Sequence, residues 1–147
     1  MKKWLPAIAV LIFGLHSCQD KSAEASARWD EVIDIHNEVM PKMGAIHQTS
    51  KALNDLVAMA DSLSLSGADQ EEIAAQLQAL QAADDAMMDW MNNFQQLERL
   101  QREKSHQEVM DYLNTEEIRI KEVKTAMESS IAKGQDLLQQ LTTPTKE

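Results

Sequence analysis

Apolar and small residues recur along this chain at alternating intervals of three and four, and this spacing restricts what the chain can fold into. The first such row, which we call a seam, consists of Trp29, Val32, His36, Val39, Met43, Ile46, Ser50, Leu53, Val57 and Ala60. Residues three and four apart lie on one face of an α-helix. The row therefore predicts a long helix that buries one face against other helices.

Two further seams follow, and a helix-start signal precedes each of them. The second seam comprises Ile73, Leu77, Leu80, Asp84, Met87, Met91 and Phe94, continued by Leu97 and Leu100. The third comprises Val109, Leu113, Ile120, Val123, Met127, Ile131, Leu138 and Leu141. Asp69 with Glu72, and Ser105 with Glu108, have the spacing of a capping box, in which two residues three apart exchange hydrogen bonds at the start of a helix.

Three long helices with short connections predict an all-α fold, an elongated antiparallel three-helix bundle in up-down-up order over residues 28–142. Pro41 lies within the first helix, where a proline removes a hydrogen bond and clashes with the carbonyl four residues earlier, so a kink is expected near it. A local break over residues 37–41 is the alternative. Residues 143–147 are expected to form a disordered tail.

The composition excludes several classes of function. The chain has 147 residues, enough for one domain, and it carries 24 acidic against 14 basic residues. A protein with this excess of negative charge is a poor ligand for nucleic acid, which is bound through Lys and Arg. One cysteine forms no internal disulfide, and the chain has no cluster of Cys and His with zinc-ligand spacing.

The N-terminus has the layout of a secretory signal. Lys2 and Lys3 precede an apolar run from Leu5 to Leu15. This run of about 11 residues is too short for a transmembrane helix, which needs about 20. Two cleavage sites compete: an Ala-x-Ala site at residues 25–27, which lies far from the apolar run, and the junction directly before Cys18.

The stretch LHSC at residues 15–18 resembles the lipobox of bacterial lipoproteins, with an aliphatic residue, a small residue and then the cysteine. His16 departs from the usual Ala, Ser or Thr. The resemblance implies removal of residues 1–17, acylation of Cys18, and an anchor in the cell envelope. In such lipoproteins an Asp directly after the cysteine is a signal for retention in the inner membrane. Gln19 stands there in this chain, so the resemblance favours the outer membrane, with either leaflet open. Residues 18–27 are small and polar and are expected to form a lipidated tether.

Polar residues interrupt the seams and form a first candidate site. Folding the helices back on one another places Ser50 opposite Asp84, with His47 one turn away and Lys124 at the same level, and His36 lies on the first seam. A polar layer of this kind fixes the register of a bundle. The alternative is an acid/base or metal site, although the Glu-x-x-His motif of di-iron bundles is absent.

Methionine and tryptophan form a second candidate. Met40, Met43, Met88 and Met91, with His36 or His47, are soft ligands suited to Cu(I). The competing interpretation is core packing, since methionine fills irregular gaps. Trp90 and Met88 lie off the second seam, so they are expected to form an exposed contact patch for a protein partner.

The string DDAMMDWMNNF at residues 84–94, with HNEVMPKM at 36–43 and SSIAK at 129–133, resembles a group of small Bacteroidota-type lipoproteins, some labelled "viral A-type inclusion protein". The resemblance implies a lipid-anchored helical envelope protein and assigns no catalytic residue. We therefore expect a non-enzymatic binding or structural module without a cofactor. It would contact the membrane through Cys18 and bind a protein partner in the envelope, or associate with itself. A Cu(I)-binding lipoprotein is the alternative.

Overall fold

The computed structural model of the chain describes residues 14–143, with side chains from residue 21 onward. Most of the predicted signal segment and of the C-terminal tail lies outside these residues. The described part is helical throughout and contains no strand, so the all-α prediction is confirmed. The elements are α1 (Gly14–Val39), the 3₁₀ turn η1 (Met40–Lys42), α2 (Met43–Ala58), α3 (Ala60–Leu63), α4 (Gly67–Asn93), α5 (Leu97–Glu103) and α6 (His106–Thr142).

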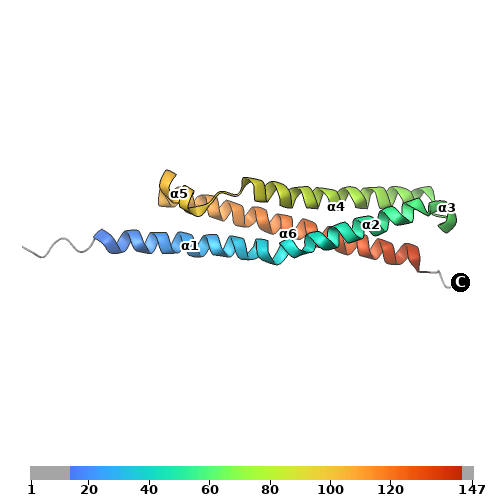
Figure 1. The fold of residues 1–147 in the computed structure, drawn as a ribbon, viewed down its shortest axis with the longest axis horizontal. Coiled ribbons are helices and arrows are strands. Elements are labelled where there is room, and N and C mark those ends of the chain that lie inside the picture. The colour runs from blue at the N-terminus through green and yellow to red at the C-terminus, as the bar shows by residue number, and fades with distance from the viewer. Residues whose placement is uncertain (1–13, 144–147) are drawn as a thin grey trace, which may run out of the picture.

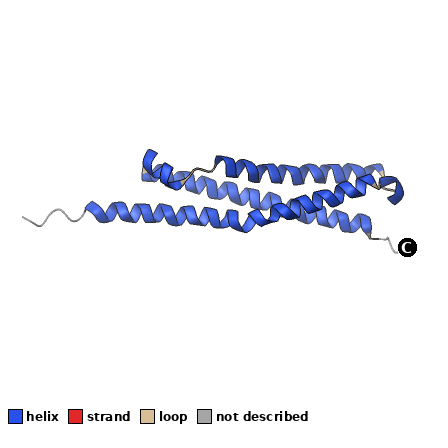
Figure 2. Ribbon diagram, viewed as in Figure 1, coloured by secondary structure: helices blue, strands red, loops and turns tan. Residues whose placement is uncertain are grey.

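These elements lie side by side in an elongated molecule (Figure 1). α1, η1 and α2 follow one another along its length, and the chain turns at α3 so that α4 runs back beside α2. After α5 the chain turns again, and α6 packs along α1, α2 and α4. Figure 2 shows that loops are confined to the turns and to the short stretch between α4 and α5. Each of the first two predicted helices is therefore divided into shorter elements.

The first division lies at Pro41, near which the sequence analysis expects a kink or, alternatively, a local break over residues 37–41. Residues 40–42 form a single 3₁₀ turn with the proline near its start, and Met43 begins α2 directly afterwards. Backbone hydrogen bonds in a 3₁₀ turn join residues three apart rather than the four of an α-helix. This local change of pattern accommodates the missing N–H of proline. The break thus separates α1 from α2 without a loop.

The expected tether is wrong for residues 21–27, because α1 runs through them without interruption. Ala25 is 1% exposed and packs in a small cluster with Leu97, Leu100, Val109 and Leu113. Small residues such as Ala favour a helix as readily as a flexible segment, and here burial against α5 and α6 decides the outcome. The folded body therefore begins within a few residues of Cys18.

Capping boxes start both long return helices. The box predicted at Ser105 and Glu108 is confirmed at the start of α6. The box predicted at Asp69 and Glu72 is wrong by three residues, because Ser66 caps α4. The Ser66 hydroxyl accepts from the Asp69 backbone N–H, and the Asp69 carboxylate accepts from the Ser66 backbone N–H. Ser64, in the left-handed conformation with φ 56°, reverses the chain just before this cap.

The buried faces are rotated slightly from the predicted seams. Beyond Ile46, the buried residues of α2 are Thr49, Leu53 and Leu56 rather than Ser50 and Val57. In α6, Ser130, Gly134 and Leu137 continue the buried row in place of Ile131 and Leu138. Because each helix contacts more than one neighbour, its buried face is wider than a single row. A one-row pattern therefore selects only part of that face.

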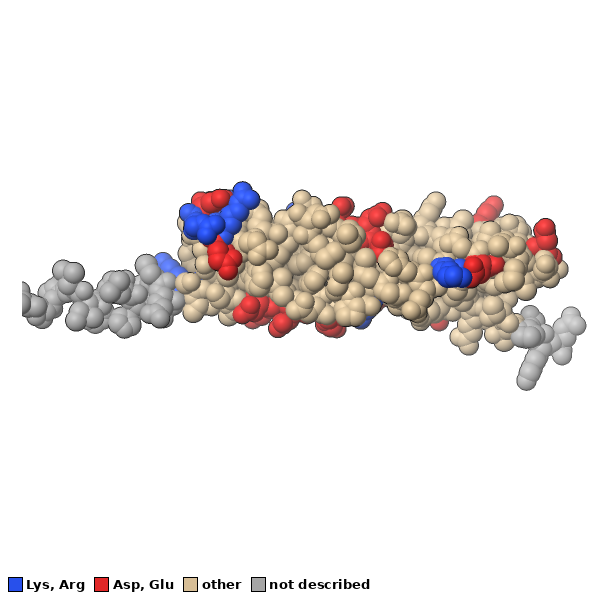
Figure 3. Space-filling model, in the orientation of Figure 1, with Lys and Arg blue, Asp and Glu red and all other residues tan. Residues whose placement is uncertain are grey.

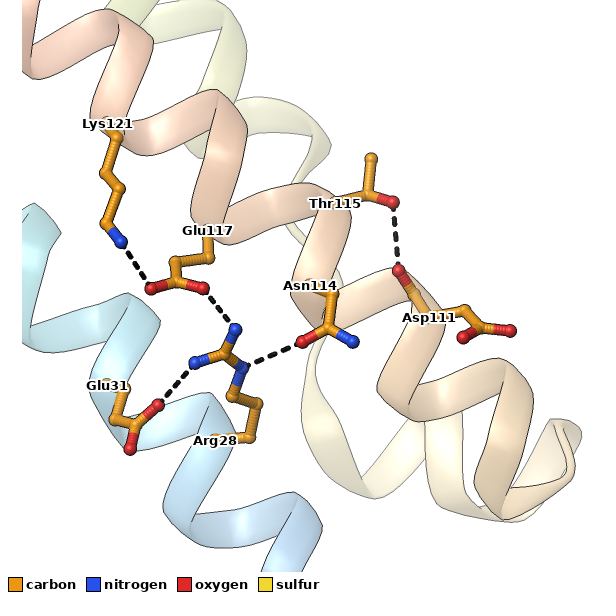
Figure 4. A network of polar contacts seen from close by, with 7 residues as sticks. All are labelled: Arg28, Glu31, Asp111, Asn114, Thr115, Glu117 and Lys121. Carbon is orange, nitrogen blue, oxygen red and sulfur yellow. Dashed lines mark hydrogen bonds and ion pairs between the residues drawn. The ribbon is translucent and has the colours of Figure 1, made fainter.

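A polar network joins α1 to α6 (Figure 4). Arg28 donates from Nε to Asn114 Oδ1 at 3.0 Å and from Nη1 to Glu31 at 2.6 Å, and it also pairs with Glu117. Lys121 donates to the other oxygen of Glu117 at 2.6 Å. The hydrogen bond from Lys121, with the charge of Arg28, lowers the pKa of Glu117. The network fixes the register of α1 on α6.

Candidate functional site

The structure brings together part of the predicted polar layer. His47 Nε2 lies 3.1 Å from Asp84 Oδ1, between α2 and α4. Lys124 lies elsewhere, where it donates to Glu38 Oε1 at 2.5 Å. No hydrogen bond between Ser50 and Asp84 is present among the described residues. The side chain of His47 is 67% exposed, so this pair is an ordinary surface contact rather than an enclosed acid/base site.

The prediction of an exposed contact patch at Met88 and Trp90 is correct for the exposure of Met88 and wrong for that of Trp90. Met88 is 43% exposed, but Trp90 is only 7% exposed and belongs to the main core. The buried row of α4 keeps Met87 from the predicted seam but has Ala83 and Trp90 in place of Asp84 and Met91. The exposed surface around Met88 therefore has no tryptophan at its centre.

The methionines of the Cu(I) hypothesis do not share one environment. Met40, Met43 and Met91 are half-buried and pack against the main core, whereas the exposed Met88 does not. Within the described part of the chain, no group of three or more His, Cys, Asp or Glu is placed to hold a metal ion. The packing of Met40, Met43 and Met91 favours the gap-filling role of methionine.

Aromatic rings gather where α1, α4 and α6 meet. Trp90 stacks on Phe94 with ring centroids 4.6 Å apart, and on His36 at 5.5 Å. Phe94 also lies 5.9 Å from Trp29 and 6.2 Å from Tyr112. The indole nitrogens of Trp29 and Trp90 and the Nε2 of His36 are buried without a hydrogen-bond partner among the described residues. Such orphaned groups cost free energy, so this cluster is not optimised for stability alone.

A groove opens beside this cluster, between α4 and α6. Its volume is about 790 Å³, which is within the usual range for ligand sites. The residues that line it are Ala86, Asp89, Trp90, Asn93, Gln95, Tyr112, Glu116, Arg119, Glu122, Val123 and Ala126. It therefore combines two aromatic residues and two amides with three carboxylates and one guanidinium group. The lining charges sum to minus two.

Glu116 is the most unusual of these residues, because it is a carboxylate that is only 4% exposed. Its Oε1 accepts a hydrogen bond of 2.8 Å from Arg119, whose side chain is 60% exposed. Burial of a charged group is costly unless it is well paired. Glu116 occupies a position on the buried row of α6 between Leu113 and Ile120, where an apolar residue would pack equally well.

Tyr112 lines the groove beside Gln95, which lies in the short stretch between α4 and α5. Its hydroxyl oxygen accepts a hydrogen bond of 2.8 Å from the backbone N–H of Gln95. Burial raises the pKa of Tyr112, although the hydrogen bond from Gln95 acts in the opposite direction. The phenol therefore stays protonated, and its own O–H can donate to a bound group.

Glu116, Tyr112 and Arg119 were not predicted from the sequence. A signal for Glu116 is present, since this residue lies three after Leu113 and four before Ile120, at a position that the third seam requires to be apolar. A charged residue at a seam position indicates a buried polar site. Tyr112 and Arg119 carry no such signal, because their place beside Trp90 depends on how α6 packs on α4.

The predicted lipid-attachment residue, Cys18, lies within α1, and its side chain is outside the described residues. None of the described helices is long and apolar enough to cross a membrane. Comparison of the chain with protein-family models, with curated proteins and with solved structures finds no match.

Proposed function

We propose that this chain is a non-enzymatic lipoprotein of the cell envelope, acylated at Cys18, which binds a partner protein in the groove between α4 and α6. The observation that carries the binding site is the buried carboxylate of Glu116 beside Trp90 and Tyr112. The lipobox-like residues 15–18 and the Gln19 that follows support an anchor in the outer membrane. In this proposal the elements form a three-helix bundle in up-down-up order: α1 to α3 form the first helical segment, with the kink at Pro41, α4 and α5 the second, and α6 the third.

The chemistry of the groove indicates a cationic group on the partner. Asp89, Glu116 and Glu122 outnumber Arg119 in the lining, so the field in the groove is negative. A guanidinium or ammonium group between such carboxylates would complete the pairing of Glu116. The aromatic rings supply apolar contact area for the stem of a Lys or Arg side chain. We therefore propose that the partner inserts a basic side chain.

Binding of a short arginine peptide and of its citrulline counterpart to the purified full chain tests the groove. Citrulline keeps the shape of arginine but has no charge. We expect the arginine peptide to bind more tightly, and its affinity to fall as salt is raised. The double substitution Glu116→Gln and Asp89→Asn should weaken binding of the arginine peptide roughly tenfold or more.

The matched control is the pair Glu71→Gln and Glu72→Gln, which removes the same charge from exposed positions near the other end of α4. Equal binding of the two peptides, or equal losses in the two double variants, would contradict the proposal. Capture from detergent-solubilised envelopes then identifies the partner. A protein whose recovery depends on Glu116 and Asp89 supports the account, whereas recovery of this chain alone would replace it with self-association.

A further inference from the structure

A second hollow lies at the end of the molecule where α1 begins. It has a volume of about 340 Å³ and is lined by Lys21, Ser22, Ala25, Gln101, Lys104, His106 and Val109. Ala25 and Val109, each 1% exposed, form its apolar floor. The polar residues around them come from α1, from α5, from the turn after α5 and from the first residue of α6. We call this hollow the basal pocket.

The charge of the basal pocket is opposite to that of the chain. The chain carries a net charge of −10, but the charged residues described in the pocket lining are Lys21 and Lys104, with His106 as the third titratable group. The larger groove, by comparison, is lined by three carboxylates. Figure 3 shows Lys and Arg gathered over α5 at this end of the molecule, with carboxylates beside them.

The carboxylates near the pocket already have partners, one of which, His106, also lines the pocket. Glu103 pairs with Arg99 at 3.1 Å, and Glu24 lies 3.0 Å from His106. Glu108, which is close enough to Lys104 to feel its charge, accepts hydrogen bonds from the side chain and backbone of Ser105. In the described part of the chain, neither Lys21 nor Lys104 forms an ion pair within 4.0 Å. Both ammonium groups are exposed at the rim of the pocket.

The hydrogen-bonding groups of the pocket are donors suited to an oxyanion. Each lysine offers three N–H groups, and the Ser22 hydroxyl accepts from Gln101 Nε2 at 3.4 Å, which leaves its own O–H to donate. Lysine ammonium and hydroxyl groups are common ligands of phosphate. If the phosphate belongs to a larger molecule, an apolar group next to it could pack on the floor formed by Ala25 and Val109.

The position of the pocket in the chain indicates where such a phosphate would come from. Lys21 lies three residues after Cys18 in the same helix, which is about 4.5 Å along the helix axis. An acyl chain on Cys18 would therefore place the basal pocket at the level of the lipid headgroups. We propose that the basal pocket binds the phosphate of a membrane lipid headgroup, so that the bundle docks end-on against the bilayer. The lipid as the source of the phosphate rests on the proposed anchor at Cys18.

Nuclear magnetic resonance of the full chain in alkyl glucoside micelles tests the pocket. The backbone amide signals of Lys21, Ser22, Lys104 and His106 are followed while three probes are added separately: short-chain phosphatidylglycerol, a phosphate-free diacylglycerol of equal chain length, and inorganic phosphate. We expect saturable shifts with phosphatidylglycerol and none with the diacylglycerol. Shifts with inorganic phosphate as well would support the same chemistry, and shifts with inorganic phosphate alone would overturn the lipid as its source.

Charge-reversal variants complete the test. Lys21→Glu with Lys104→Glu should weaken the phosphatidylglycerol response roughly tenfold or more, since each lysine near an anionic headgroup contributes to binding. Lys51→Glu with Lys133→Glu, at exposed positions on α2 and α6, should leave it within about twofold. Equal shifts with both lipids, or equal losses in both variants, would overturn the proposal.

A failure of the basal-pocket proposal can be distinguished from a failure of the proposed function. A chain without acylation at Cys18 would refute the anchor but could still respond to inorganic phosphate. The groove substitutions lie on α4 and α6, at a distance from the basal pocket. They should weaken peptide binding without changing the amide shifts that phosphatidylglycerol causes in the pocket.

Discussion

The indole ring of Trp90 lies stacked on the imidazole ring of His36, with ring centroids 5.5 Å apart and an angle of 24° between the planes. This contact joins α4 to α1 at the level of the groove. Phe94 stacks on Trp90 at 4.6 Å, so Trp90 has aromatic neighbours from the residue that follows α4 and from α1. Trp90 is therefore a structural residue that forms the wall of the groove.

The buried position of Trp90 predicts a large loss of stability on truncation. Trp90→Ala should lower the free energy of unfolding by about 3–5 kcal/mol, as is usual when a buried tryptophan is removed. Met88→Ala, two residues earlier at an exposed position, should change it by less than about 0.5 kcal/mol. Urea unfolding followed by circular dichroism measures both values. Similar small effects of the two substitutions would show that Trp90 is exposed.

Gly134 lies on the buried face of α6, in close contact with Thr49 of α2 and Gln76 of α4. A Cβ atom at this position would lie 2.6 Å from Thr49 Cγ2 and 3.4 Å from Gln76 Nε2. We expect Gly134→Ala to destabilise the fold by about 1–3 kcal/mol through overpacking, although alanine favours helix more than glycine does. Adding Thr49→Ser, which removes Cγ2, should restore much of the loss.

Gly44→Ala is the matched control for Gly134→Ala. A Cβ atom at Gly44 would meet nothing within 4 Å, and the residue lies in the first turn of α2. This substitution should stabilise the protein by about 0.4–1 kcal/mol, because it reduces the conformational freedom of the unfolded chain. Thermal unfolding of the two variants is expected to move in opposite directions. A shift in the same direction would contradict the close packing at Gly134.

The network around Arg28 predicts that replacing Arg28 by Ala lowers stability more than replacing Arg99 by Ala. The Arg28 side chain is 25% exposed and bridges α1 and α6, whereas Arg99 is 63% exposed and pairs with Glu103 in its own helix. Arg99→Ala should change stability by no more than about 0.5 kcal/mol, and Arg28→Ala should cost more. The pKa of Glu117 should also rise in the Arg28→Ala variant, because one of the charges that lowers it is lost. Nuclear magnetic resonance titration of the Glu117 carboxyl checks this, and an unchanged pKa would contradict the network.

The capping boxes predict how stability depends on pH. Hydrogen bonds from Ser105 lower the pKa of Glu108, and hydrogen bonds from Ser66 lower the pKa of Asp69. A carboxyl group with a lower pKa in the folded than in the unfolded state stabilises the fold above its unfolded pKa. That stabilisation is lost as the pH falls through the folded pKa. The difference in stability between the natural chain and Ser105→Ala should therefore narrow below the ordinary glutamate pKa of 4.5. A difference that widens on acidification would show that Glu108 does not act in this way.

The sequence predicts the class of fold well because the apolar rows extend over most of the described chain, from Trp29 to Leu141. It also marks the region of Pro41, where the missing N–H acts locally, and the start of α6, where Ser105 and Glu108 form the expected capping box. The seam pattern selects Ser50 and Met91 where the structure buries Thr49 and Trp90, because the rotation of each helix depends on two or three neighbours at once. The groove depends on the same rotations. Only Glu116, a charge within an apolar row, indicates it in advance.

Mass spectrometry of the mature N-terminus tests the central claim, that the protein is anchored through Cys18. The account predicts an N-terminal peptide that begins at Cys18 and carries the mass of two or three acyl chains on that residue. A peptide that begins at Met1 or Arg28, or an unmodified Cys18, would contradict it.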